Sequence, residues 1–144
     1  MFSNILVADS DVESRDRFHE ILFSMGHKVT CAPNGNEVIV RLEAERPDLL
    51  ILEYELPSEG SIKTLEKIRK FDQKIKAVVL TKDEPGLEVE KAVKPLGVYA
   101  VIKKDFSSHL MFKTILEALS ETQEVSQSNK YFYLGKILVV DDVP

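Results

Sequence analysis

Four residues with chemically capable side chains stand at or directly after the ends of apolar runs of strand length: Asp9, Glu53, Thr81 and Lys104. If the fold brought them together, the two carboxylates would offer oxygen ligands to a hard cation. The hydroxyl and the ammonium group would offer a hydrogen bond and a compensating charge to an anion. Their chemistry therefore depends on whether four distant segments meet at one place.

The apolar runs predict five strands buried on both faces, because they are continuous and rich in branched aliphatic residues. They are Ile5–Ala8, Val29–Cys31, Leu49–Leu52, Ala77–Leu80 and Val98–Ile102. Segments with helical periodicity separate and follow them, and single helices between strands indicate right-handed crossovers. We therefore predict an α/β fold, a (βα)5 doubly wound parallel five-stranded sheet. In such sheets the ligand site lies beyond the carboxyl ends of the strands, where the strand order reverses.

The first helix is expected to begin at Ser10, whose hydroxyl could cap it while Glu13 reaches back to form a capping box. The fourth predicted helix, near residues 87–96, is interrupted by Pro95. These local signals set the ends of the helices on either side of the predicted site.

Composition excludes several classes of protein. The net charge of −5 argues against nucleic acid as a direct ligand. No apolar run reaches the roughly 20 residues of a membrane helix, and the start of the chain lacks the features of a signal peptide, so we expect a cytoplasmic protein with no membrane partner. Cys31 has no Cys or His at a metal-binding spacing. We find neither a glycine-rich phosphate loop nor a nucleophile–base pair, and we expect no enzyme activity.

The order of these elements resembles the receiver domains of response regulators in two-component signalling, whose fold is flavodoxin-like. The likeness rests on Ile-Leu-Val-Ala-Asp9, on Pro47-Asp48-Leu-Leu-Ile-Leu-Glu53-Tyr-Glu-Leu-Pro57, on Leu80-Thr81 and on Ile102-Lys103-Lys104. It covers residues 1–121. Each motif alone is weak evidence, whereas their joint order and spacing is specific.

The resemblance implies a role for each of these positions. In the family, an acidic pair after the first strand and an aspartate after the third hold Mg²⁺, and that aspartate accepts a phosphoryl group. By this likeness Asp9 is the first acid of the pair, Glu53 holds the acceptor position, and Glu55 would offer its carbonyl to the metal. Thr81 and Lys104 match the hydroxyl and the lysine that contact the phosphoryl group.

Three positions depart from the family pattern. Ser10 replaces the second acid, Glu53 replaces the acceptor aspartate, and Val101 replaces the aromatic residue that usually swings on phosphorylation. One extra methylene displaces the Glu53 carboxylate by up to about 1.5 Å, and errors on the order of 1 Å can cost about a hundredfold in rate. We therefore expect no cofactor beyond weak Mg²⁺ binding, for which Asp9, Glu53 and Glu55 are the candidate ligands.

Three interpretations of Glu53 remain open, one of them being slow phosphorylation of Glu53 itself. It could mimic the phosphorylated state through an ion pair with Lys104, or it could be a solvated carboxylate at a strand end. For Asp9, a residual metal role competes with service as the acidic neighbour of Lys104, which we favour.

The C-terminal part of the chain turns polar after residue 121, and then Ile137–Asp142 repeats the pattern of Ile5–Ser10 with an acidic pair. We predict a receiver-like domain over residues 1–121, a linker or helical extension over 122–135, and the start of a truncated second receiver domain over 136–144. We expect the apolar run Ile137–Val140 to dock on its own domain or on a neighbouring molecule.

The predicted function is that of a regulatory pseudo-receiver in a multidomain response regulator, acting through protein contacts, with Glu53 at the acceptor position. Its expected partners are other receiver or output domains, a histidine kinase, or a second copy of itself, through the fourth helix, fifth strand and fifth helix. One alternative is a conventional phosphoaccepting receiver in a phosphorelay. The other is a small flavodoxin-like ligand binder.

Overall fold

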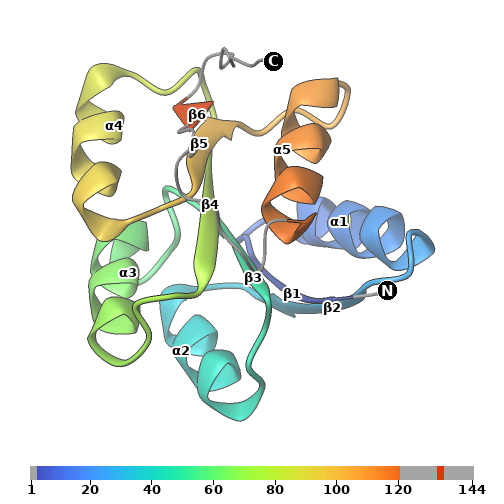
Figure 1. Cartoon of the computed structure of the whole chain (residues 1–144), viewed down its shortest axis with the longest axis horizontal. Helices are drawn as coiled ribbons and strands as arrows, with labels where there is room; N and C mark the ends of the chain where they lie inside the picture. Colours follow the sequence, from blue (N-terminus) through green and yellow to red (C-terminus); the bar gives the residue numbers. More distant parts are fainter. Residues whose placement is uncertain (1–2, 121–132, 135–144) are drawn as a thin grey trace.

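The computed structural model describes residues 3–120 and 133–134 as one parallel sheet covered by helices on both faces (Figure 1). The strand order is β2-β1-β3-β4-β5-β6, and every pairing is parallel. The strands are β1 (Asn4–Ala8), β2 (Lys28–Ala32), β3 (Leu49–Glu53), β4 (Lys76–Thr81), β5 (Ala100–Lys103) and β6 (Tyr133–Leu134). The helices are α1 (Val12–Ser24), α2 (Gly35–Ala44), α3 (Gly60–Phe71), α4 (Leu87–Val93), η1 (Lys94–Leu96) and α5 (His109–Ser120).

The two faces of the sheet bury separate apolar clusters. Phe18 and Leu22 of α1 join Met111 and Ile115 of α5 on one face. Helices α2, α3 and α4 cover the other face, where the buried residues include Val38, Leu65 and Val93. The central strands are buried on both sides, which confirms the doubly wound (βα)5 prediction.

The predicted N-cap of the first helix is wrong by one residue. Asp11, not Ser10, is the N-cap of α1, and its carboxylate accepts a hydrogen bond from the Ser14 amide at 3.1 Å. The reason is that the amide and hydroxyl of Ser10 both point to Glu53 instead. At the fourth helix, the α-helical part ends at Val93 and Pro95 lies in the short η1 turn, so the expected interruption is confirmed.

The C-terminal region is described only at β6. Tyr133 and Leu134 pair with Ala100 and Val101 of β5, a strand that the sequence did not predict. The predicted second-domain start at 136–144, including the Ile137–Val140 run, lies outside the described residues, as does most of the predicted linker. Within residues 3–120 and 133–134, no helix has the length and apolar character needed to cross a bilayer.

Candidate phosphoacceptor-type site at the carboxyl edge of the sheet

The parallel register brings the four candidate residues to one edge of the sheet. Asp9 follows β1, Glu53 ends β3, Thr81 ends β4 and Lys104 follows β5. Ala8 pairs with Leu52 and Glu53 with Leu80, so these strand ends lie side by side. The strand order reverses between β1 and β3, which is where open α/β sheets place their ligand sites.

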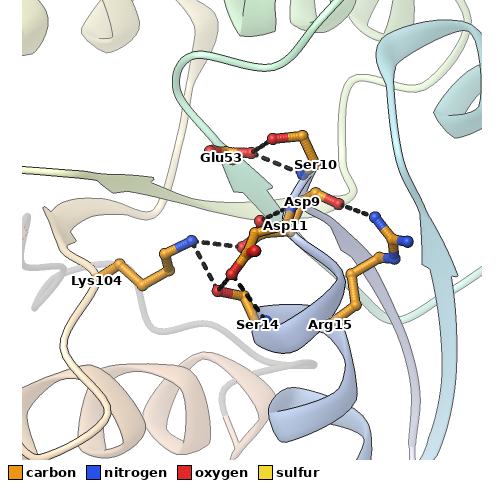
Figure 2. Close-up of polar contacts among 7 residues, drawn as sticks. All are labelled: Asp9, Ser10, Asp11, Ser14, Arg15, Glu53 and Lys104. Carbon is orange, nitrogen blue, oxygen red and sulfur yellow. Dashed lines mark hydrogen bonds and ion pairs between the residues drawn. The ribbon is translucent and has the colours of Figure 1, made fainter.

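Asp9 forms an ion pair with Lys104, and the carboxylate is almost completely buried. Lys104 Nζ lies 2.8 Å from Asp9 Oδ2, and the exposed fraction of the Asp9 side chain is 2%. The other carboxylate oxygen, Oδ1, accepts the amide N–H of Asp11 at 2.9 Å. Both oxygens of Asp9 therefore have donors from the protein itself (Figure 2).

Lys104 is held on the α1 side of the site by a second acceptor. Its ammonium group donates to Ser14 Oγ at 3.1 Å, and the Ser14 hydroxyl donates in turn to Asp11 Oδ2 at 3.0 Å. The two hydrogen bonds from Ser14 lower the pKa of Asp11 below its ordinary value. The lysine is thus tied into the first turn of α1 through a short hydrogen-bonded chain.

Glu53 makes its polar contacts with Ser10. Oε1 accepts the Ser10 amide at 2.8 Å and the Ser10 hydroxyl at 3.0 Å, as Figure 2 shows. Among the described residues Lys104 pairs with Asp9, so the ion pair considered between Glu53 and Lys104 is not the arrangement in the structure. Glu53 is instead a partly exposed carboxylate held by the residue that replaces the second acid.

Sequence reasoning did not identify Ser14 or Arg15 as parts of this site. Arg15 donates through Nη1 to the backbone carbonyl of Asp9 at 2.8 Å, and Ser14 links Lys104 to Asp11. A signal was present, since residues three and four positions after the cap of a helix face back toward it. The signal becomes specific only when Asp11, rather than Ser10, is known to be the cap.

The loop that carries Lys104 is fixed at both ends. The Lys104 amide donates to the Thr81 carbonyl at 2.8 Å. Two residues further on, the Phe106 ring packs on Phe18 with centroids 4.7 Å apart, and the Arg17 guanidinium lies 4.4 Å from the Phe106 centroid. These contacts join the loop after β5 to α1 and keep Lys104 beside Asp9. The neighbouring Lys103 is exposed, which explains why Lys104 is the lysine of the site.

Thr81 is largely buried, and its hydroxyl donates to the backbone carbonyl of Asp83 in the following loop. With Glu53, Glu55 and Lys104 it lines a cavity of about 300 Å³ at the sheet edge. Asp11, Leu80 and Lys82 complete the lining. Thr81 and Glu53 therefore line the same cavity, although the Thr81 hydroxyl is hydrogen-bonded to the loop that follows β4.

Val101 lies in the apolar cluster on the face covered by α2, α3 and α4, with no exposed surface. It neighbours Val79 in the sheet register. A short branched side chain enclosed in this way has no ring to move between a buried and an exposed position.

The carboxylates do not form a ready cation site. Within the part of the chain that the structure describes, no group of three or more His, Cys, Asp or Glu side chains is placed to hold a metal ion. Asp9 is occupied by Lys104 and by the Asp11 amide, and position 10 supplies a hydroxyl where a hard cation would prefer a carboxylate. The residues present therefore fit Mg²⁺ poorly in this arrangement.

A parallel sheet whose first five strands have the order 2-1-3-4-5, with acidic, hydroxyl and lysine positions gathered at its carboxyl edge, defines a receiver-type signalling domain. The family model for the response regulator receiver domain matches residues 5–116, and the chain belongs to that family. Domains of this family are signalling modules that interact with kinases and output domains.

Two curated relatives illustrate the similarity. The chain is 26% identical over 106 residues to sporulation initiation phosphotransferase F of Bacillus subtilis (strain 168), covering 74% of this chain and 85% of that protein. It is 28% identical over 107 residues to the transcriptional regulatory protein CrdR of Helicobacter pylori (strain ATCC 700392 / 26695), covering 74% of this chain but 50% of that protein. The match thus spans nearly all of one relative and half of the other.

Solved structures agree with this assignment. A CheY-like response regulator receiver domain protein from Methanospirillum hungatei JF-1 superposes with a TM-score of 0.78 at 26% identity, covering 85% of this chain and 98% of that one. NtrX from Brucella abortus has a TM-score of 0.77 at 23% identity, covering 85% of this chain and 28% of that one. The second likeness concerns the fold alone.

Proposed function

We propose that this chain is a pseudo-receiver, a regulatory receiver module that works through protein contacts and does not accept a phosphoryl group. The observation that carries the proposal is the internal pairing of the site. Each oxygen of Asp9 already accepts a donor from the protein, Lys104 or the Asp11 amide, and Glu53 is held by Ser10. The two carboxylates that would bind a cation or a phosphoryl group therefore already have partners within the protein.

Charge supports the same reading. Mg²⁺ binding at such an edge depends on clustered carboxylates that repel one another until the cation arrives. Here the Lys104 ammonium group neutralises Asp9 directly, and Ser10 removes one negative charge from the cluster. Little carboxylate repulsion is left for a divalent cation to relieve, and we therefore expect only weak Mg²⁺ affinity.

Geometry at the acceptor position adds a second obstacle. The Glu53 side chain is one methylene longer than aspartate, and its Oε1 accepts two hydrogen bonds that fix it toward Ser10. Phosphoryl transfer consists mostly of positioning and charge neutralisation. A carboxylate held away from Lys104 meets neither requirement.

Protein contacts then become the means of signalling. The surface formed by α4, β5 and α5 is the expected contact region, and the partners we propose are other receiver or output domains of a parent protein, a histidine kinase, or a second copy. Leu87 on α4 and Leu116 on α5 are exposed apolar residues on these elements. With Val101 buried at the switch position, this surface would stay in one state.

The deciding experiment is incubation with acetyl phosphate and Mg²⁺, followed by intact-mass spectrometry of the wild type and of Glu53→Asp/Ser10→Asp. We expect no adduct on the wild type and one phosphoryl group on the double variant. Mg²⁺ at millimolar concentration should raise the melting temperature of the double variant only. An adduct on Glu53 of the wild type would instead establish a conventional phosphoacceptor.

A further inference from the structure

The sixth strand extends the sheet at the edge of β5. Tyr133 pairs with Ala100 and Leu134 with Val101, both in parallel register. Parallel pairing requires β6 to start at the amino edge of the sheet, where α5 ends at Ser120. The structure thus presents β5, α5 and β6 as one more crossover unit (Figure 1).

The hand of this unit is opposite to that of its neighbours. From β3 to β4 and from β4 to β5 the chain advances along the sheet with α3 and α4 on one face. From β5 to β6 it advances in the same direction, but α5 lies on the opposite face with α1, as Figure 1 shows. Crossovers between parallel strands are right-handed in about 98% of cases, so a connection through α5 within one chain has the disfavoured hand.

The pairing itself is also short. It covers two residues of β5, whereas the β4 side of the same strand pairs over four. A two-residue ladder has few hydrogen bonds to compensate for an unfavourable connection. The edge nevertheless benefits from a strand, because an uncovered apolar edge strand is prone to pairing with other chains.

We propose that β5 receives this strand from a second copy of the chain, so that two copies exchange their Tyr133–Leu134 segments reciprocally. Every backbone contact made within one chain is available between identical chains, and the constraint of hand disappears when the strand comes from elsewhere. The 12 residues between Ser120 and Tyr133 can span up to about 40 Å, which suffices to reach a neighbouring copy. The partner at this edge is therefore the chain itself, whether or not Glu53 accepts a phosphoryl group.

The exchange can be tested with single cysteines placed on paired residues. Neighbouring strands lie about 4.8 Å apart, within the range of Cα separations that disulfides bridge. One chain would carry Val101→Cys and another Leu134→Cys, both in a Cys31→Ser background that removes the native thiol. Mixing and oxidising them should give a disulfide-linked species of about twice the 16.3 kDa chain mass, and neither chain alone should give it.

A chain carrying both cysteines separates the two ways of occupying the edge. Exchange predicts covalent dimers, whereas an internal disulfide in a monomer would show that the strand comes from the same chain and would overturn the proposal. Light scattering of the unmodified chain provides the independent measurement. We expect a dimer, and a monomer at all concentrations up to about 1 mM, the effective concentration typical of a tethered segment, would also overturn it.

A proline variant completes the test. Replacing both Tyr133 and Leu134 with proline removes both backbone donors of β6, whichever of them faces β5, and should convert the dimer to a monomer without changing the helical circular dichroism. Ser128→Pro, which leaves the paired residues unchanged, is the matched control and should remain dimeric. A doubly substituted protein that stays dimeric would place the dimer contact elsewhere.

Discussion

Lys104 and Asp9 are 95 residues apart in the sequence, yet the lysine Nζ lies 2.8 Å from the aspartate Oδ2. The pair joins the loop after β5 to the end of β1 across two intervening strands. Asp9 is buried and Lys104 is mostly shielded from solvent. The ion pair therefore contributes to the stability of the fold.

Removing the lysine should destabilise the fold. Lys104→Met leaves the buried Asp9 carboxylate without its charged partner, and we expect the free energy of unfolding to fall by about 3 kcal/mol. Urea denaturation measures this, with the exposed neighbour Lys103→Met as the matched control. Adding Asp9→Asn to Lys104→Met should recover part of the loss. Additive effects in this double-mutant cycle would contradict a direct interaction.

The N-cap of α1 should make stability depend on pH. Hydrogen bonds from Ser14 lower the pKa of Asp11 from 3.8. Since the folded pKa lies below the unfolded value, the stabilisation is present above about pH 4 and is lost as the pH falls through the folded pKa. Asp11→Ala should therefore be less stable than the wild type at pH 7, and the difference should shrink in the acid range.

Asp16→Ala is the control for that measurement, because it removes an exposed carboxylate from the same helix without removing a cap. Thermal melts of the three proteins between pH 7 and pH 3 give the comparison. A gap between wild type and Asp11→Ala that stays constant over this range would exclude the carboxylate as its source.

The contact between α2 and α3 depends on a glycine. A Cβ added at Gly35 would overlap the Thr64 hydroxyl oxygen, which donates to the Gly60 carbonyl. We expect Gly35→Ala to destabilise the protein by about 2 kcal/mol, the usual effect of overpacking. In a Thr64→Ala background the same substitution should cost much less, as measured by chemical denaturation.

Gly86→Ala is the matched control for this substitution, because nothing lies within 4 Å of an added Cβ there. Because Gly86 is the N-cap of α4, where glycine is preferred to alanine, this variant should lose about 0.5 kcal/mol, well below the loss expected for Gly35→Ala. If Gly35→Ala lost no more stability than Gly86→Ala, α2 and α3 could move apart without cost. The close contact between Gly35 and Thr64 would then not limit the residue at position 35.

Arg69 fixes the turn that precedes β5. Its guanidinium donates to the carbonyls of Leu96 and Ile75, each at 2.8 Å, and to Gly97 at 3.2 Å. Arg69→Met should lower the free energy of unfolding by about 2 kcal/mol, because it leaves partly buried carbonyls without donors. The adjacent exposed Lys70→Met should change it little. Arg69→Lys should restore only part of the loss, since one ammonium group cannot reach three separate carbonyls.

The sequence predicted the sheet well because strands that are buried on both faces are apolar at almost every position. Continuous apolar runs such as Leu49–Leu52 and Ala77–Leu80 became β3 and β4 with ends shifted by one residue. The rule that ligand sites lie at the carboxyl ends of parallel strands then located Asp9, Glu53, Thr81 and Lys104 together. The general position of the site therefore followed from the strands alone.

The pairing within the site could not be predicted in the same way. Whether Lys104 reaches Asp9 or Glu53, and whether Ser10 or Asp11 caps α1, depends on rotamers and distances of about 1 Å that no residue pattern encodes. Strand β6 was not predicted, for a different reason. It pairs through two backbone positions, and backbone pairing leaves little trace in the choice of side chains.

The tilted packing of Phe106 on Phe18, with Arg17 over the Phe106 ring, has a consequence for motion. A loop opens locally with ease only if its opening exposes little apolar surface, and here the partly buried Phe106 ring would have to leave its contact with Phe18 to release Lys104. Amide protons such as that of Lys104, bonded to the Thr81 carbonyl, should then exchange with solvent at rates close to those of the central strands. The loop that carries Lys104 should therefore open about as rarely as the interior of the domain.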